Sequence, residues 1–190
     1  MRLAKAVSKK MKRPDIRGFF DTVTSTWTYV VYEDGGSDKR CAIIDSVLDY
    51  DIHSGRTKTV AADRVIDFIQ RQGLEVEWIL ETHIHADHLT ASAYIKEKLG
   101  GKTAISKHIL KVLETWQPIF HNEIDTPLNG EQFDYIFDDD EEFTVGPFGT
   151  QIMHTPGHTP ADTSYVIGDA VFVGDARFLP DVGTGRGDFP

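Results

Sequence analysis

Long apolar runs and cysteine are scarce in this sequence, and each shortage excludes a class of protein. Nothing in the 190 residues approaches the ~20 consecutive apolar residues that a membrane-spanning helix needs, and the N-terminus lacks the apolar core of a secretion signal. The one cysteine, Cys41, has no partner in the chain for a disulfide and lies in an apolar, strand-like run, so we expect a buried thiol. The sequence therefore predicts a cytoplasmic protein with no membrane partner.

Positive charge is also in short supply. The chain has 20 Lys and Arg against 30 Asp and Glu, a net charge of −10 that disfavours nucleic acid as a partner, because phosphate binding needs clustered cations. One basic stretch lies near the N-terminus, and we interpret residues 1–15 as a solvated extension. Residues 16–190 are then expected to form one domain with a sizeable core. The basic residues of the extension are Arg2, Lys5, Lys9, Lys10, Lys12 and Arg13.

Strand-like and helix-like segments are mixed along the domain, which is compatible with a layered α/β fold. Two β-branched segments flank Gly35 and Gly36 and predict an opening hairpin. One helix is expected to end at Gly73, a residue suited to a C-cap. We expect the polar segment 49–56 to be a loop and the acidic segment 138–142 to be a solvated turn between strands. The predicted strands are 25–33, 40–44, 76–80, 103–105, 142–145, 151–154, 164–167 and 170–173, and the predicted helices are 61–72, 91–99 and 107–116.

Three histidines and an aspartate are packed into residues 83–88, directly after the predicted strand 76–80. Imidazole nitrogen and carboxylate oxygen are ligands for zinc and ferrous iron, and the lack of thiolates beside them argues against a closed structural zinc site. His83 and His85 point to the same side if the backbone is extended, and a turn after them would bring Asp87 and His88 to a neighbouring position. The pattern predicts a metal site.

A second group of candidate ligands follows later in the sequence. The pair Pro156 and Gly157 predicts a tight turn that fixes the direction of His158. Asp175 follows the predicted strand 170–173, so its carboxylate would lie near a strand end. The remaining histidines are predicted to be surface or packing residues, with the last of them facing the interior of a sheet rather than binding metal. They are His53, His108, His121 and His154.

Residues 82–88 resemble the THxHxDH signature of the metallo-β-lactamase superfamily, and segments 156–160 and 174–176 resemble its next two ligand segments in the same order. Within the superfamily, segments 45–51, 78–83 and 185–189 resemble the persulfide dioxygenases and the β-lactamase hydrolase-like proteins. The resemblance runs over residues 16–190. It implies an αββα sandwich with a metal site along one edge of two packed sheets, of which this chain is expected to lack the C-terminal part.

The superfamily resemblance also implies ligands. One metal would be bound by His83, His85 and His158 with Asp175, and a second by Asp87, His88 and the same Asp175. The superfamily normally completes the second site with a histidine that would lie beyond residue 190, so the resemblance implies either a fragment or a protein with one working metal.

The dioxygenase branch implies a single ferrous iron held by His83, His158 and Asp175, an arrangement that leaves positions open for substrate and O₂. The neighbouring catalytic residues His85, Asp87 and His88 would then orient ligands, exclude a second metal or handle protons. Arg186 is the candidate for clamping a substrate carboxylate, with a structural pair to Asp188 as the alternative.

These implications lead to an iron-dependent persulfide dioxygenase that oxidises glutathione persulfide, or a similar small persulfide, with O₂ to sulfite and thiol. By analogy with the family, we also expect the protein to form a homo-oligomer. One alternative is a zinc-dependent thioester hydrolase of the glyoxalase II type, in which Asp87 would hold or deprotonate the nucleophilic water. Another is an inactive or regulatory metal-binding module, or a fragment. The ligand types alone do not separate iron from zinc.

Overall fold

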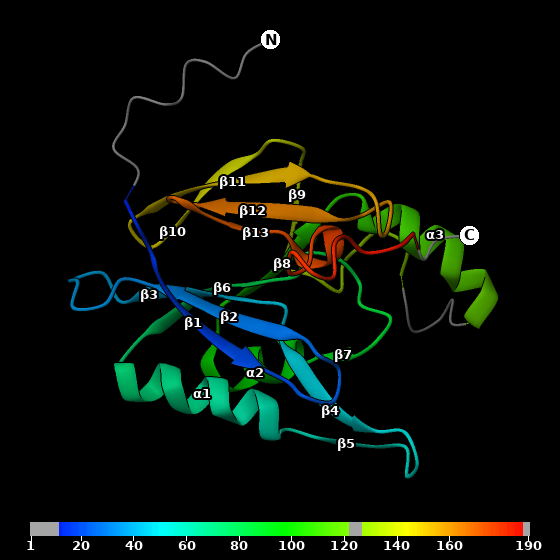
Figure 1. Ribbon diagram of the computed structural model, residues 1–190, viewed down its shortest axis with the longest axis horizontal. Helices are drawn as coiled ribbons and strands as arrows, with labels where there is room; N and C mark the ends of the chain where they lie inside the picture. Colours follow the sequence, from blue (N-terminus) through cyan, green and yellow to red (C-terminus); the bar gives the residue numbers. More distant parts are fainter. Residues whose placement is uncertain (1–11, 122–126, 188–190) are drawn as a thin grey trace.

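Two β-sheets packed face to face form the body of the molecule (Figure 1). The computed structural model describes residues 12–121 and 127–187. The first sheet has six strands in the order β1-β2-β3-β6-β8-β9, in which β3, β6, β8 and β9 run parallel and β1 and β2 are antiparallel to their neighbours. Its strands are β1 (Asp15–Phe20), β2 (Trp27–Tyr32), β3 (Arg40–Ile44), β6 (Glu75–Leu80), β8 (Lys102–Ser106) and β9 (Tyr135–Phe137).

The second sheet is an antiparallel meander of four strands in sequence order. A small third sheet, in the order β5-β4-β7, extends from the edge of the molecule (Figure 1). The second sheet contains β10 (Glu142–Val145), β11 (Phe148–His154), β12 (Thr163–Ile167) and β13 (Ala170–Phe172), and the third contains β4 (Val47–Asp51), β5 (Arg56–Lys58) and β7 (Leu89–Thr90).

Helices α1 (Val60–Gln72) and α2 (Ser92–Leu99) cover the outer face of the first sheet, and α3 (Ile109–Phe120) lies at one end of the layers (Figure 1). As predicted, α1 ends at Gly73, which has the left-handed conformation with φ 64°. Within the described residues, no helix lies on the outer face of the second sheet, and none is long and apolar enough to cross a membrane. The arrangement confirms the predicted α/β class and the metallo-β-lactamase fold, of whose αββα layers the described residues form αββ.

The first sheet is buried on both faces, and its sequence shows this directly. Successive residues of β3 alternate between two cores: Cys41 and Ile43 face α1, while Ala42 and Ile44 face the second sheet. Cys41 is completely buried, as predicted, and burial raises the pKa of its thiol to about 12. The cores on the two faces fix the sheet, and therefore the direction of the loops that leave its strand ends.

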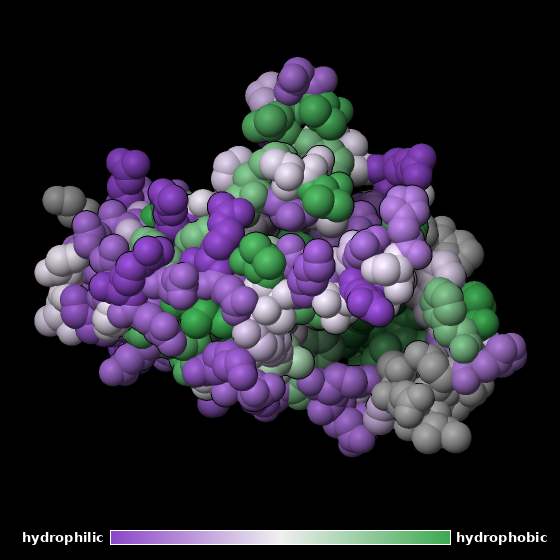
Figure 2. All heavy atoms as spheres, turned by 90° about the horizontal axis from the view of Figure 1, so that it is seen from below, coloured by the Kyte–Doolittle hydropathy of each residue, from purple (hydrophilic) through white to green (hydrophobic). Residues whose placement is uncertain are grey.

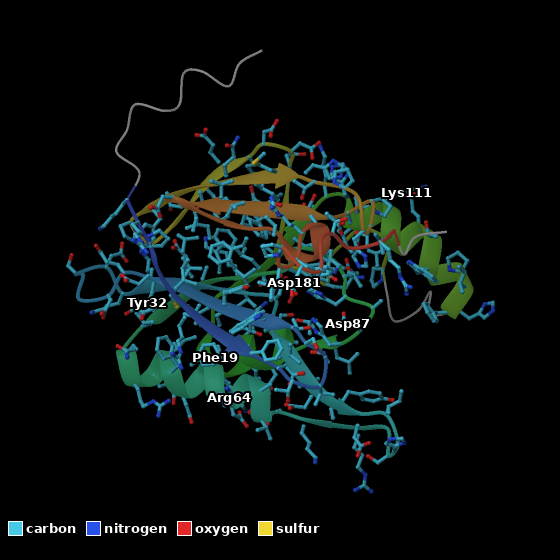
Figure 3. The ribbon with its side chains drawn as sticks, viewed as in Figure 1. Phe19, Tyr32, Arg64, Asp87, Lys111 and Asp181 are labelled. Carbon is cyan, nitrogen blue, oxygen red and sulfur yellow. The ribbon has the colours of Figure 1, made fainter. Side chains whose placement is uncertain are left out.

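On the helix side of the sheet, aromatic rings complete the core. Phe19 and Tyr32 lie between β-strands and α1 (Figure 3), and both rings contact Phe68 edge to face. Seen from the side of α1 and the β4–β5 hairpin, the surface is mainly hydrophilic and its apolar groups are small and scattered (Figure 2).

Several predictions of secondary structure need correction. The segment 49–56 is not a loop throughout: it contains the end of β4, a turn in which Asp51 accepts hydrogen bonds from the backbone of His53 and Ser54, and the start of β5. β5 is exposed along its whole length, so it has no apolar alternation to reveal it. β1, β7 and β9 were also not predicted, and α3 continues past Pro118 to Phe120. Most of the predicted extension 1–15 lies outside the described residues.

Candidate metal centre

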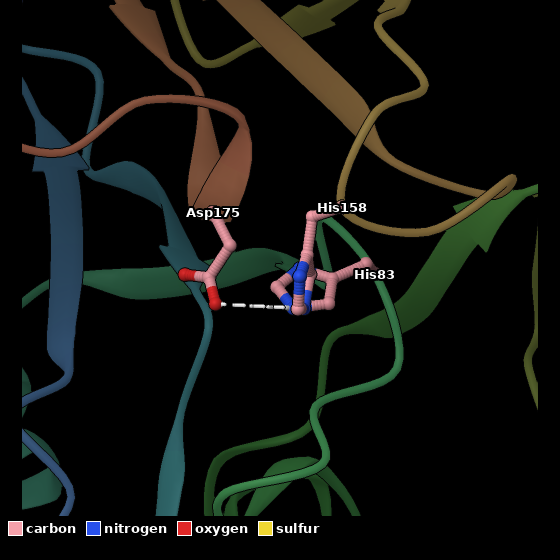
Figure 4. A group of neighbouring side chains, drawn as sticks. All are labelled: His83, His158 and Asp175. Carbon is pink, nitrogen blue, oxygen red and sulfur yellow. Dashed lines mark ion pairs between the residues drawn. The ribbon is translucent and has the colours of Figure 1, made fainter. Parts of the chain in front are cut away.

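His83, His158 and Asp175 converge from three loops at one edge of the two sheets (Figure 4). His83 follows β6, His158 lies between β11 and β12, and Asp175 lies in the short 3₁₀ turn Gly174–Ala176 after β13. Oδ2 of Asp175 is 3.8 Å from Nε2 of His83 and 3.7 Å from Nε2 of His158. The three residues thus turn one donor atom each toward a common point.

Hydrogen bonds on the opposite ring nitrogens select these donor atoms. Nδ1 of His158 donates to the backbone carbonyl of Arg186 at 2.7 Å, which leaves the lone pair on Nε2. The hydroxyl of Thr82 donates to Asp45 at 2.9 Å, so it accepts a hydrogen bond from Nδ1 of His83 at 3.0 Å. Both imidazoles therefore present an unprotonated Nε2, as metal-binding histidines must.

The backbone around the ligands is held by a second layer of contacts. The carboxylate of Asp162, which is buried, accepts hydrogen bonds from the backbone of His158 at 2.8 Å and of Thr159 at 2.9 Å. The amide of Thr163 donates to the carbonyl of Thr82 at 3.0 Å. This last bond joins the His158 loop directly to the loop that carries His83.

Two glycines let the ligand loops approach each other closely. A Cβ atom on Gly174, which has φ +49°, would lie 2.3 Å from Oγ1 of Thr82. A Cβ atom on Gly185 would lie 2.3 Å from the carbonyl oxygen of Asp175 and 3.2 Å from Cβ of His158. No side chain fits at either position without moving a ligand loop.

The residues present fit a metal ion. Nε2 of His83 is buried and has no hydrogen-bond partner among the described residues, which would be costly if nothing bound it. Burial lowers the pKa of His83 to about 4, with a further contribution from His85, so the ring is neutral at pH 7. The observed gaps are a few tenths of an ångström wider than the about 3.0–3.4 Å between neighbouring ligands of an ion with ~2.1 Å bonds. Two imidazoles and a carboxylate suit ferrous iron or zinc.

His85, Asp87 and His88 form a second group beside the first, with one donor atom each within 4.8 Å of the others. The ring of His85 lies 4.0 Å from that of His83 and 4.1 Å from that of His88, between centroids. Asp87 is exposed on the loop after β6 (Figure 3) and accepts a long hydrogen bond of 3.4 Å from Thr26. Nδ1 of His88 donates to the carbonyl of Leu89 at 3.1 Å, and its buried Nε2 has no partner in the described chain.

The outer nitrogen of His85 faces two buried carboxylates. Its Nε2 lies 3.2 Å from Oδ1 of Asp45 and 3.6 Å from Oε2 of Glu81, so Nδ1 is the nitrogen left for a metal. Burial alone would lower the pKa of His85, but the hydrogen bond and charge of Asp45, followed by the nearby carboxylate of Glu81, raise it to about 10. For Asp45 burial acts in the opposite direction and raises the pKa of the carboxyl group. The hydrogen bond and charge of His85 outweigh burial, so the net pKa of Asp45 is lowered.

Asp45 and Glu81 were not among the predicted site residues. Asp45 follows directly after β3, just as the predicted ligand Asp175 follows closely after β13, so the same strand-end rule would have found it. Its φ of +52°, unusual outside glycine, is not visible in the sequence. Glu81 is 3% exposed, accepts a hydrogen bond of 2.5 Å from Thr90 and was hidden within an apolar strand end.

Arg186 is exposed, and its backbone carbonyl accepts a hydrogen bond from the candidate ligand His158. The alternative partner Asp188 lies outside the described residues. His53 and His121 are exposed, and neither joins a group of potential ligands among the described residues. Of the seven predicted site residues, six therefore fall into two adjoining groups and one borders the first group through its backbone.

The chain is similar to several known proteins. A family model described as the metallo-beta-lactamase superfamily matches residues 21–189. The chain is 47% identical over 180 residues to a beta-lactamase hydrolase-like protein of Xylella fastidiosa, covering 95% of this chain and 41% of that protein. It is 52% identical over 154 residues to Glyoxylase B2 of Dictyostelium discoideum, covering 80% and 53% respectively.

Persulfide dioxygenase ETHE1 of Homo sapiens is 30% identical over 178 residues, covering 92% of this chain and 56% of the human protein. The crystal structure of ETHE1 from Myxococcus xanthus matches with a TM-score of 0.66 and 28% identity, covering 92% of this chain and 62% of that one. The chain thus spans less than two thirds of the length of each of these relatives. Members of the matched family are mostly metal-dependent enzymes, and the chain belongs to the metallo-beta-lactamase superfamily.

Proposed function

We propose that this protein is an iron-dependent dioxygenase that oxidises a small persulfide, most simply glutathione persulfide. The observation that carries the proposal is the first ligand group: Nε2 of His83, Nε2 of His158 and Oδ2 of Asp175 turn toward one point. Two histidines and a carboxylate are the donor set of mononuclear ferrous oxygenases, which need open positions for O₂ and substrate. The similarity to the human persulfide dioxygenase supports the same reaction.

The overall reaction would convert the persulfide RSSH, O₂ and water to the thiol RSH, sulfite and two protons. A ferrous ion bound to the first group supplies the redox chemistry that lets O₂ oxidise the terminal sulfur. What the chain contributes is orientation: the bonds from His158 to Arg186 and from His83 to Thr82 fix both rings before substrate arrives.

His88 would accept the proton from the terminal sulfur of the persulfide. Its Nδ1 donates to the carbonyl of Leu89, so the neutral ring carries a lone pair on Nε2, and that buried atom has no partner among the described residues. It lies beside His85, next to the first group. An acceptor at this position would favour the ionised persulfide, the more nucleophilic form.

Arg186 would bind the carboxylate end of the substrate. Its backbone is fixed against His158, so its exposed side chain starts within a few bonds of the metal ligands. A guanidinium can engage a carboxylate with two parallel hydrogen bonds, and glutathione carries two carboxylates.

Zinc-dependent hydrolysis of a glutathione thioester is the second candidate. The 52% identity to Glyoxylase B2 favours it, and so does the second ligand group of His85, Asp87 and His88, which offers donors for a second ion beside the first. In that reaction Asp87, exposed and weakly held by Thr26, would orient the attacking water.

Oxygen uptake tests the proposal. The protein, reconstituted with ferrous iron under anaerobic conditions, is mixed with glutathione persulfide in an oxygen electrode, and sulfite is quantified. We expect enzyme-dependent uptake that is lost in His158→Ala and unchanged in the matched control His53→Ala, because His53 is exposed in the β4–β5 turn. The same preparations, loaded with zinc, are assayed with S-lactoylglutathione.

The two substrates separate the candidates. Thioester hydrolysis by the zinc protein without persulfide-dependent oxygen uptake by the iron protein would reject the dioxygenase in favour of the hydrolase. A folded chain without oxygen uptake when loaded with iron and without thioester hydrolysis when loaded with zinc would reject both reactions for this 190-residue chain. Kinetics of Arg186→Lys test the substrate contact separately, since loss of the two-pronged contact should raise KM more than it lowers kcat.

A further inference from the structure

We propose that His108, Asp139 and His154 form a second, solvent-facing site for a divalent transition-metal ion. One potential ligand atom from each residue lies within 4.8 Å of the other two. The three residues come from separate segments: the start of α3, the turn between β9 and β10, and the end of β11. The proposal is independent of the reaction proposed above, because it uses none of the same ligands.

The two histidine rings are stacked in parallel. Their centroids are 3.6 Å apart and the planes differ by 10°, and one ring nitrogen of each lies within 4.8 Å of the other. Both residues are half-buried, whereas the side chain of Asp139 is 42% exposed. An ion can therefore reach the group from water and keep water molecules at its remaining positions.

Each imidazole can offer one ring nitrogen to a metal ion. Nε2 of His154 donates to the backbone carbonyl of Pro160 at 2.9 Å, so the neutral ring keeps a lone pair on Nδ1. Nε2 of His108 donates to Oδ1 of Asp139 at 2.7 Å. An ion between these last two atoms would take the place of that hydrogen, and the His108 ring would carry its proton on Nδ1 instead.

The carboxylate of Asp139 is already oriented as a single-oxygen ligand. Oδ1 faces His108, while Oδ2 lies 2.9 Å from Nζ of Lys107. Metal-binding carboxylates are commonly held by such a contact on the other oxygen. Hydrogen bonds from Lys107 and then His108 lower the pKa of Asp139, so it is ionised at pH 7.

The chemistry selects the class of ion. Two imidazoles and one carboxylate suit Zn²⁺, Ni²⁺ or Cu²⁺, whereas Mg²⁺ and Ca²⁺ prefer oxygen ligands throughout. Binding would bring the donor atoms, now within 4.8 Å, to the about 3.0–3.4 Å expected around such an ion, which requires Nε2 of His108 and Oδ1 of Asp139 to move apart from 2.7 Å. Side chains that are partly exposed make rotations of this size rapidly.

An ion here would tie together the start of α3, the β9–β10 turn and the segment 155–162. That segment contains His158 and is closed by the bond from His154 to Pro160. The proposed role is therefore structural support for the loop that carries a ligand of the main centre.

Equilibrium dialysis of the full chain against Zn²⁺, with metal content measured by mass spectrometry, tests the site. Wild-type protein should bind one more zinc ion per chain than His108→Ala or Asp139→Asn, while His53→Ala should keep the wild-type content. In the His158→Ala background, which weakens the main centre, adding His108→Ala should remove a further equivalent. The melting temperature of wild type should rise with Zn²⁺ by more than that of His108→Ala.

Equal zinc content and affinity in wild type, His108→Ala and Asp139→Asn, each with the wild-type circular dichroism spectrum, would overturn the proposal. Binding of Mg²⁺ that depends on His108 would overturn the assigned class of ion. Because Asp139→Asn keeps the size of the side chain, it maintains the test if His108→Ala does not fold.

Discussion

The two groups of candidate ligands meet at the six-residue segment 83–88, which contributes His83 to the first group and all three residues of the second, but the groups differ in how they are supported. In the first group, Nε2 of His83 has no hydrogen-bond partner among the described residues, and Nδ1 of the same ring is hydrogen-bonded to Thr82. In the second group, Nε2 of His85 faces the carboxylates of Asp45 and Glu81. In the first group the donor atoms lie around a single point, whereas in the second one donor, Asp87, is exposed and weakly held.

Asp45 connects the two groups. Its Oδ2 accepts from the hydroxyl of Thr82, which in turn accepts from His83, while its Oδ1 contacts His85 directly. A single buried carboxylate therefore orients one imidazole of each group, through one intermediary in the first case and none in the second. Residue types set which side chains can bind metal, but these supports decide which nitrogen each histidine presents.

The largest difference is expected from removing a ligand of each group in turn. His158→Ala should reduce bound iron to background and abolish oxygen uptake, because two remaining donors do not hold ferrous iron tightly. His88→Ala should keep close to one iron per chain and lose activity through the missing acceptor. Iron content after reconstitution and gel filtration, measured with the ferrozine assay, compares the two. Equal loss of iron in both variants would mean that the groups are not distinct.

Asp45→Asn should be the most destabilising of the supporting changes. The asparagine removes the nearer of the two buried carboxylates beside His85, and removing one member of a buried pair costs about 3–5 kcal/mol. For a chain of this size the melting temperature should fall by roughly 6 °C or more. Differential scanning calorimetry of the metal-free protein gives the value.

Asp38→Asn is the matched control for this loss of charge. Asp38 is on the surface, and hydrogen bonds from Arg40 lower its pKa to about 2, yet the pair is exposed to solvent. Solvent screens such pairs, so the melting temperature should change little. Similar decreases in melting temperature for the two variants would contradict the larger contribution to stability that we assign to Asp45.

Gly185→Ala tests the close packing of the first group. The added methyl group would lie 2.3 Å from the carbonyl oxygen of Asp175, so the loop must shift and move a ligand with it. We expect iron affinity to fall by about 10- to 100-fold, the usual effect of disturbing residues around metal ligands. Gly157→Ala is the control, since a methyl group there would have only its chain neighbours within 4 Å. Competition with a chelator measures both affinities, and equal values would contradict the packing argument.

Sequence patterns were compatible with a layered α/β fold, and the family resemblance implied the sandwich. In the structure the apolar strands of the first sheet are buried on both faces, as in Cys41 to Ile44. Sequence patterns failed for β5, whose three residues are all exposed, and for β7, which has only two residues. Such strands form because tertiary structure supplies their partners, not because their own residues favour pairing.

At the site, ligand types and spacing were sufficient to identify six residues that meet in the structure, with His83 and Asp175 brought together across 92 positions of the sequence. The supporting residues were harder. Asp162 and Glu81 act through hydrogen bonds to backbone and side chains that only the folded loops create. The direction of a ring nitrogen depends on such bonds, so no spacing rule could specify it.

The smallest effect on stability is expected for Glu81→Gln. This variant distinguishes the roles of the two buried carboxyl groups beside His85. Burial raises the pKa of Glu81, whereas the net pKa of Asp45 is lowered, so we expect His85 to depend less on the charge of Glu81 than on that of Asp45, and an amide has nearly the shape of a carboxyl group. Oε2 of Glu81 has no hydrogen-bond partner among the described residues, while Oε1 can still accept from Thr90 after the substitution. We therefore expect a change of less than about 1 kcal/mol in the free energy of unfolding. Urea denaturation of the metal-free variants, compared directly with Asp45→Asn, measures it. A loss as large as that of Asp45→Asn would mean that both carboxylates carry charge, and that His85 is held by the pair rather than by Asp45.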